Sequence, residues 1–171
     1  GGEFVSSRVR EVNRSGDGFV VRTEDLEYTA DYVIIAAGVF GAKLLGQEPP
    51  CYTIASHGYS SPTASASVIF IQDGYLWSFP GESYDSVGGG TYPDCRLLPS
   101  FDEMSTRIKK CFDEELILNG TPVPLFNSDL VLKLNSAETG LLFTGDSAGL
   151  IDNWIGAGID FALDSGRHRA V

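Results

Sequence analysis

The chain has 171 residues, 43% hydrophobic and 20% charged, values typical of a globular protein with its own core. Its formal net charge of −11 argues against a nucleic-acid partner, since binding to phosphates requires clustered lysine and arginine. No apolar run approaches the ~20 residues that span a bilayer. The three cysteines have no metal-ligand spacing, so we expect reduced thiols in a cytoplasmic protein without a metal site: Cys51, Cys95 and Cys111.

The N-terminal segment, residues 3–37, predicts a small antiparallel meander followed by a buried strand. Glycines in the turn at 15–18 supply the positive φ that a hairpin requires. The apolar run at 32–38 ends in small residues, among them Ala36 and Gly38, which let the backbone lie against a flat ligand or another backbone. Alone, this pattern is weak, because any buried strand that ends in glycine shares it.

The next segment, residues 47–92, predicts a sheet. Two prolines at 49 and 50 predict a loop, where we place a domain crossing. Asp73-Gly74 predicts a two-residue hairpin. His57 is expected at a strand end, as a surface or capping residue and not as a catalyst. The four expected strands are 52–56, 65–72, 75–79 and 86–90.

The third of these strands carries a row of aromatic residues. Strand alternation puts Tyr75, Trp77 and Phe79 on one face. Gly88 and Gly90 on the next strand have no side chains, which leaves room above the sheet. Such a row can form an apolar wall for a hydrophobic ligand. Taken by itself, however, an aromatic stripe of this kind favours an ordinary core face.

Residues 99–118 predict a helix that packs on the sheet. Ser100 and Glu103 have the spacing of a capping box, and apolar residues recur at helical spacing. Asn119-Gly120 predicts the end of this helix. An extended linker is expected at 121–124 and a strand at 130–134.

The last stretch, residues 142–166, predicts a strand, a turn, a loop with two glycines and a helix from Ile159. Asp146 follows the strand directly, where ligands of open α/β sheets tend to bind. Gly156 and Gly158 allow close approach of the backbone, and the helix start favours negative charge. A carboxylate can accept hydrogen bonds from the ribityl hydroxyls of a flavin, and the helix start favours the negative charge of the reduced ring. The two features together suit a flavin.

Three stretches resemble the geranylgeranyl reductase family, FAD-dependent oxidoreductases of the glutathione-reductase type with the p-hydroxybenzoate hydroxylase fold. Residues 75–80 and 88–90 match its YxWxFP and GxG signature, 30–38 its AD-x-VI-x-A-x-G motif, and 145–166 its GDAAG and GEGI region. The resemblance implies eight residues that hold FAD: Ala36, Gly38, Gly145, Asp146, Gly156, Ala157, Gly158 and Ile159. It implies six that contact the substrate: Tyr75, Trp77, Phe79, Pro80, Gly88 and Gly90.

The implied fold class is α+β, as part of an α/β family fold. Residues 1–46 and 129–171 would belong to the FAD-binding domain, and 47–128 would form an antiparallel substrate-binding sheet covered by one helix. Asp146 would hold the ribityl chain, and 156–159 would offer backbone N–H groups to the pyrimidine edge of the flavin. Because no GxGxxG follows a strand and the chain begins abruptly, we expect the middle of a longer flavoprotein.

The implied reaction is the reduction of carbon–carbon double bonds in isoprenoid chains of the geranylgeranyl type, with hydride from reduced FAD. The partners would be a prenyl lipid or another hydrophobic small molecule and an electron donor, with peripheral membrane contact left open. No catalytic residue is identified. One alternative is a flavin monooxygenase or halogenase, since Ala157 stands where the family has Glu. The other is a folded fragment without cofactor.

Overall fold

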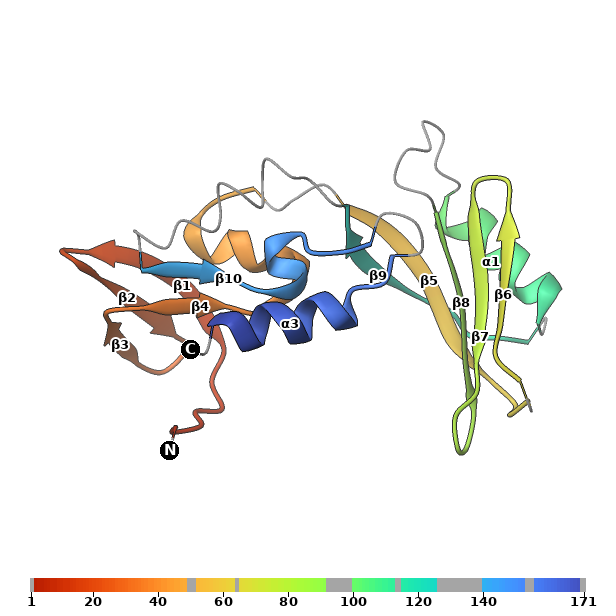
Figure 1. The fold of residues 1–171 in the computed structure, drawn as a ribbon, viewed down its shortest axis with the longest axis horizontal. Coiled ribbons are helices and arrows are strands. Elements are labelled where there is room, and N and C mark those ends of the chain that lie inside the picture. Colours follow the sequence, from red (N-terminus) through yellow and green to blue (C-terminus); the bar gives the residue numbers. More distant parts are fainter. Residues whose placement is uncertain are drawn as a thin grey trace. The chain divides into compact units, whose positions relative to one another are not determined.

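The chain divides into two compact units in the computed structural model (Figure 1). The first contains Gly1–Pro50, Asn127–Ile151 and Gly158–Val171, and the second contains Cys51–Phe126 and Asp152–Ala157. Strands and helices are mixed along the chain, which confirms the predicted α+β class. The structure describes residues 2–48, 52–63, 65–91, 100–112, 115–125, 140–152 and 156–169.

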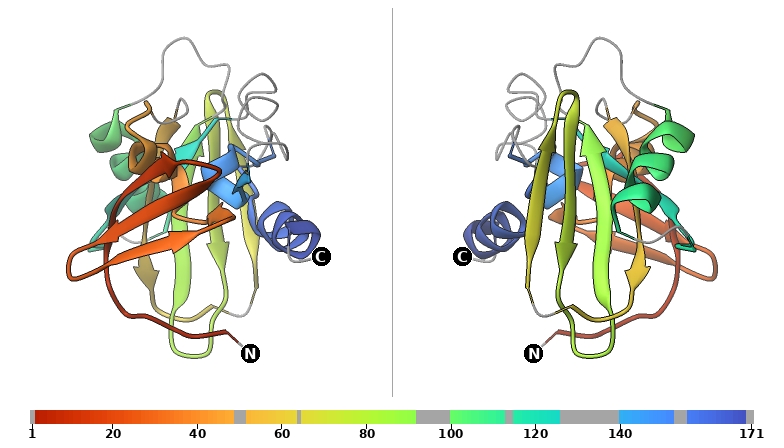
Figure 2. Two further views of the ribbon diagram at one scale, coloured as in Figure 1. Left: turned by 90° about the vertical axis from the view of Figure 1, so that its left-hand side faces the viewer. Right: turned by 90° about the vertical axis from the view of Figure 1, so that its right-hand side faces the viewer.

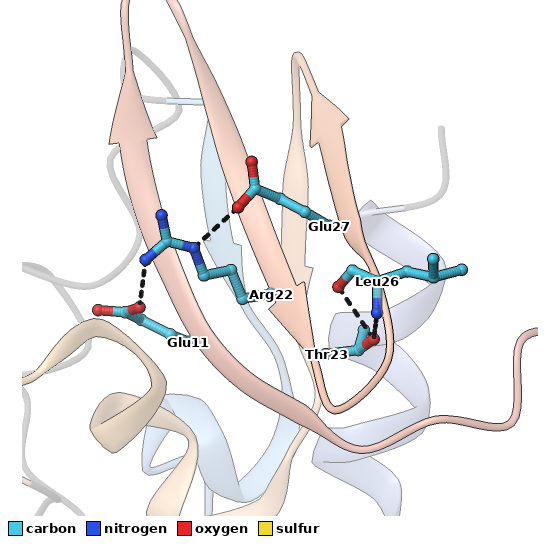
Figure 3. A network of polar contacts seen from close by, with 5 residues as sticks. All are labelled: Glu11, Arg22, Thr23, Leu26 and Glu27. Carbon is cyan, nitrogen blue, oxygen red and sulfur yellow. Dashed lines mark hydrogen bonds and ion pairs between the residues drawn. The ribbon is translucent and has the colours of Figure 1, made fainter.

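The first unit begins with an antiparallel meander, as predicted. Its strands are β1 (Val9–Ser15), β2 (Gly18–Thr23) and β3 (Glu27–Ala30), paired in the order β1-β2-β3. Gly16 has φ 61° in the first turn, as the hairpin requires. Figure 3 shows how the meander is held together on its exposed side. Arg22 donates to Glu27 (2.9 Å) and Glu11 (3.2 Å) on the neighbouring strands, and Thr23 and Leu26 close the second turn.

A parallel strand pair, β4 (Val33–Ile35) and β10 (Leu141–Phe143), lies beside the meander. Gly38, with φ 70°, turns the chain into the 3-10 helix η1 (Gly38–Leu45), so the strand predicted to reach residue 38 ends at Ile35. Apolar side chains from both layers meet in one core. Its buried members are Val12, Phe19, Ile35, Phe143 and Ala148.

The second unit is a five-stranded antiparallel sheet with helix α1 (Phe101–Cys111) against one face (Figure 2). The strand order is β6-β7-β8-β5-β9. Leu76 and Val87 of the sheet pack against Met104 and Ile108 of the helix, together with Leu116. The strands are β5 (Tyr52–Ser60), β6 (Ser67–Ile71), β7 (Gly74–Phe79), β8 (Asp85–Thr91) and β9 (Asn119–Pro124).

Of the predictions for residues 100–124, the start of the helix is confirmed and the segment that follows the helix is not. The capping box is confirmed, since the Ser100 hydroxyl accepts from Glu103 N–H and the Glu103 carboxylate accepts from Ser100 N–H. The helix predicted to reach residue 118 and to end at Asn119-Gly120 already ends at Cys111. Asn119–Pro124 is strand β9, which pairs with β5, so the prediction of an extended linker at 121–124 was also wrong. Its prolines are tolerated because β9 is an edge strand, where one side of the backbone needs no ladder hydrogen bond.

The remaining elements follow β10. The 3-10 helix η3 (Gly145–Ala148) comes directly after it, and helix α3 (Ile159–Arg169) begins at the predicted residue. The strand predicted at 130–134 lies outside the described residues. No helix in the described part of the chain combines the length and the apolar character needed to cross a bilayer.

Candidate cofactor and substrate sites

The turn after β10 is built on two left-handed glycines. Gly145 has φ 53°, and a Cβ added to it would lie 3.1 Å from the Cβ of Ala162 in α3. Gly149, with φ 65°, ends η3 and donates its N–H to the carbonyl of Asp146. Side chains at either position would be strained. The two glycines therefore fix the backbone on both sides of Asp146.

Asp146 lies half-buried beside the start of α3. An added Cβ on Gly158 would be 3.2 Å from the Asp146 carboxylate oxygen Oδ1, so only glycine leaves this approach open. Burial raises the pKa of the carboxyl above its ordinary value. The first N–H groups of α3, from Ile159 on, have no acceptor within the helix. The structure thus brings together a carboxylate and a helix N-terminus, two of the predicted cofactor contacts.

The loop that precedes α3 closes on itself. Asp152 N–H donates to the carbonyl of Ala157 (2.9 Å), and Gly156 N–H donates back to the carbonyl of Asp152 (3.0 Å). Gly156 has φ 64°. Its N–H is therefore used inside the loop, which corrects the expectation that residues 156–159 all offer this group to a ligand. Gly156 and Ala157 belong to the second unit, and Gly158 to the first.

Ser147 is a site residue that sequence reasoning missed. Its fully buried hydroxyl donates to the carbonyl of Gly38 (2.8 Å) and accepts from the N–H of Ala37 (2.9 Å). Gly41 leaves space for it, because an added Cβ there would be 2.6 Å from Ser147 Oγ. These bonds fasten the turn after β10 to the end of β4, so that the predicted residues Ala36 and Gly38 lie next to this turn. The available signal was a hydroxyl residue in a position where the family pattern has alanine.

The first unit also contains an apolar hollow of about 510 Å³. This volume lies in the range of small-molecule sites. Ala36 is the one predicted cofactor residue on its wall. The lining residues are Arg8, Val9, Val12, Val21, Val33, Ile34, Ile35, Ala36, Ala37 and Leu44.

The aromatic row of β7 is present as expected. The ring centroids of Tyr75 and Trp77 are 5.8 Å apart, and those of Trp77 and Phe79 are 6.5 Å apart. Leu76 and Ser78 point to the other face and are buried. Phe79 is 48% exposed, so the row is more open than a core face.

The space expected above the two glycines is filled by the rings themselves. A Cβ on Gly88 would lie 2.2 Å from Cζ2 of Trp77, and a Cβ on Gly90 would lie 3.2 Å from the Tyr75 hydroxyl. The glycines thus allow the rings to lie flat across β8, which corrects the prediction of open space. Pro80 is exposed and follows the row directly.

A buried carboxylate holds the chain beyond Pro80. Asp85, at the start of β8, has no exposed surface and accepts the N–H groups of Thr63 (2.9 Å) and Gly81 (3.4 Å). The Thr63 hydroxyl also donates to it. This hydroxyl contributes most to lowering the pKa of Asp85, and burial opposes the shift. Asp85 therefore stays ionised and positions the end of the aromatic row.

His57 lies inside β5 and not at a strand end as predicted. Its Nε2 is 2.7 Å from the hydroxyl of Thr121 in β9.

Val68 and Phe70 of β6, which sequence reasoning missed, pair with Trp77 and Tyr75 and extend the exposed apolar face. The hairpin predicted between the strands 65–72 and 75–79 is confirmed by this pairing, but the two residues were not identified as part of the apolar face.

No protein-family model matches the chain, but comparison with known proteins finds curated relatives and solved structures of similar fold. The chain is 23% identical over 193 residues to digeranylgeranylglycerophospholipid reductase 2 of Methanosphaera stadtmanae, covering 98% of this chain and 48% of the reductase. It is 35% identical over 106 residues to the corresponding reductase of Thermoplasma volcanium, covering 57% of this chain and 25% of that protein. The chain therefore spans about half the length of the first relative and about a quarter of the length of the second.

Solved structures with a similar fold include several flavin-dependent halogenases. One from Brevundimonas has a TM-score of 0.64 at 17% identity, covering 97% of this chain and 37% of the halogenase. A tryptophan 6-halogenase from Streptomyces toxytricini has a TM-score of 0.65 at 14% identity, covering 93% of this chain and 34% of the enzyme. At these identities the likeness is one of fold. The predicted resemblance to geranylgeranyl reductases is thus confirmed by curated relatives, on a fold that flavin-dependent halogenases share.

Proposed function

We propose that the chain is part of an FAD-dependent oxidoreductase that reduces carbon–carbon double bonds of isoprenoid chains. The observation that carries this proposal is the row of half-buried Tyr75 and Trp77 and exposed Phe79, which lies across Gly88 and Gly90. Such a row gives a long apolar wall without an ionisable group at its centre, suited to a polyene chain. Similarity to two digeranylgeranylglycerophospholipid reductases supports the same substrate class.

The turn after β10 fits the cofactor. Gly158 and the Asp146 carboxylate lie so close together that a Cβ on Gly158 would be 3.2 Å from Oδ1, so a polyol chain that reaches the carboxylate also reaches the glycine backbone. Asp146 would accept hydrogen bonds from ribityl hydroxyls, and the first N–H groups of α3 would face the negative charge of the reduced ring. A bound, reduced flavin would supply hydride to one carbon of the double bond, and the other carbon would take a proton from solvent or a nearby group.

The chain's own residues would then bind and orient. Asp146 would fix the cofactor, while the rings of β7 would hold the isoprenoid chain and exclude water from it. Ser147 and Ser165 would keep the turn in place, since Ser147 binds the end of β4 and Ser165 accepts the N–H of Gly145 (3.1 Å). An external electron donor would return the flavin to its reduced form.

The test combines cofactor binding with product analysis. The purified chain is titrated with FAD and followed by the flavin absorbance bands, then incubated without oxygen with dithionite and a geranylgeranyl lipid. We expect perturbed flavin bands and a product that gains two hydrogen atoms for each double bond reduced. Asp146→Ala should abolish the perturbation, and Asp164→Asn, an exposed carboxylate on α3, is the matched control. A folded chain that leaves the flavin bands unchanged would contradict the proposal.

A further inference from the structure

His57 shares one rung of the five-stranded sheet with the centre of the aromatic row. Trp77 of β7 pairs with Gly88 of β8, and Gly88 pairs with His57 of β5. Residues directly opposite each other on neighbouring strands point to the same face of a sheet. The imidazole and the indole therefore lie on one face, and the residue that separates them has no side chain.

The Trp77 ring closes most of the distance between the two strands. A Cβ on Gly88 would be 2.2 Å from Cζ2 of Trp77 and 2.6 Å from the carbonyl oxygen of Ser56 in β5. The far edge of the indole thus lies over β8, next to the backbone of β5. An apolar ligand that follows the rings meets His57 at the side of the row.

The orientation of the imidazole is set from the next strand. Nε2 and the Thr121 hydroxyl of β9 are 2.7 Å apart, and His57 is half-buried while Thr121 is exposed. Its other nitrogen, Nδ1, makes no hydrogen bond with the part of the chain that the structure describes. One nitrogen is therefore anchored, and the second remains to bond a polar group of a ligand.

The charged residues around the sheet indicate which polar group of a ligand would bond to His57. In the described ranges 52–63, 65–91 and 115–125, which supply all five strands, there is no lysine or arginine. The cationic residues that the structure describes in the second unit are Arg107, Lys109 and Lys110, all on α1 and so on the opposite side of the sheet. A phosphate bound at His57 would have the imidazole as its one possible partner of opposite charge among these residues. The face instead suits an uncharged oxygen.

We propose that this face binds an amphiphile in one direction, with its hydrocarbon chain on the rings of β6 and β7 and an uncharged hydroxyl or ether oxygen hydrogen-bonded to His57. The isoprenoid nature of the hydrocarbon rests on the proposed function. The orientation and the preference for an uncharged oxygen rest on the rung geometry and on the charges of the sheet.

The test uses the fact that the chain has two histidines and two tryptophans. In a His168→Gln, Trp154→Phe background, His57 gives the single imidazole signal in proton NMR, and Trp77 gives the indole fluorescence. The probes are farnesol and farnesyl monophosphate, which have the same hydrocarbon chain. Farnesol should shift both signals and bind about tenfold or more tightly than the phosphate, because a single imidazole does not compensate the desolvation of a doubly charged phosphate.

Variants isolate the contribution of the imidazole. His57→Phe should weaken farnesol binding about three- to tenfold, the value of one hydrogen bond, and His57→Gln should restore part of it through its amide. His168→Gln alone is the matched control and should bind farnesol like the unmodified chain. Equal or tighter binding of the phosphate, or a Trp77 response that His57→Phe leaves unchanged, would overturn the proposal.

The proposal is also overturned if farnesol causes no change in Trp77 fluorescence while His57 is present. None of these measurements involves flavin, so the two proposals fail separately. A chain that binds farnesol through His57 but leaves the flavin bands unperturbed contradicts the oxidoreductase and not the binding face.

Discussion

Alanine at Gly88 is expected to disrupt the aromatic row from below. The new Cβ would lie 2.2 Å from Trp77 Cζ2, more than about 1 Å inside the ordinary contact distance of ~3.5 Å. Rotation of the indole cannot relieve this fully, because the Ser56 carbonyl oxygen, a backbone atom, would be 2.6 Å away on the other side. Overpacking of this kind costs about 1–3 kcal/mol of unfolding free energy.

Gly90→Ala is the matched control on the same strand. The three atoms nearest to its Cβ all belong to the Tyr75 side chain, the closest being the hydroxyl oxygen at 3.2 Å, and neither glycine has a positive φ. We therefore expect its unfolding free energy to stay within about 1 kcal/mol of the parent, because alanine also restricts the unfolded chain.

The assay is urea unfolding of both variants, followed by Trp77 emission in the Trp154→Phe background and by circular dichroism. Gly88→Ala should also change the emission of the folded state, since the indole must leave its position over β8. Equal stability of the two variants would refute the account, because it would mean that the ring does not lie across Gly88.

Three further outcomes follow from buried polar groups. Ser147→Ala removes two hydrogen bonds and should lower the unfolding free energy by about 1–3 kcal/mol in a urea titration, whereas Ser86→Ala should have little effect. The pKa of Asp85 is lowered, so its ionised form stabilises the fold above the unfolded pKa; this stabilisation should disappear as pH falls through the folded pKa, and Asp85→Asn should flatten the dependence of the urea midpoint on pH. The pKa of Asp146 is raised by burial, so its charge destabilises the fold at neutral pH; Asp146→Asn should raise the thermal midpoint while weakening flavin binding, and a lower midpoint would contradict the sign.

The parts of the fold that sequence predicted are those with local causes. The capping box of α1 and the left-handed glycine of the first hairpin need only neighbours a few residues away, and both were found. The prolines of β9 gave a local cue for a linker, but pairing with β5 outweighed it.

The parts of the sites that were missed depend on partners far away in the chain. Ser147 matters because it meets Ala37 and Gly38 in space, and His57 because its strand lies beside that of Gly88. Even where the residues were right, as at Gly88, the direction of the Trp77 ring decided whether space was left above the sheet. Strand order and side-chain direction are tertiary properties, and periodicity alone does not contain them.

The pairing of β5 with β9 has a consequence for how the first unit assembles. Its parallel pair joins β4 to β10, which requires closing a loop that contains nearly all of the second unit. Tyr52, where β5 begins, pairs with Pro124, where β9 ends, so a folded second unit brings the two ends of this insertion to about 5 Å, one strand spacing. Closing the long loop between β4 and β10 then costs less entropy, because the chain has to close only the two shorter connections on either side of the folded sheet, residues 36–51 and 125–140. Folding of the inserted sheet thus lowers the entropic cost of pairing β4 with β10. The first unit, which we propose to hold the cofactor, is therefore expected to form last during synthesis.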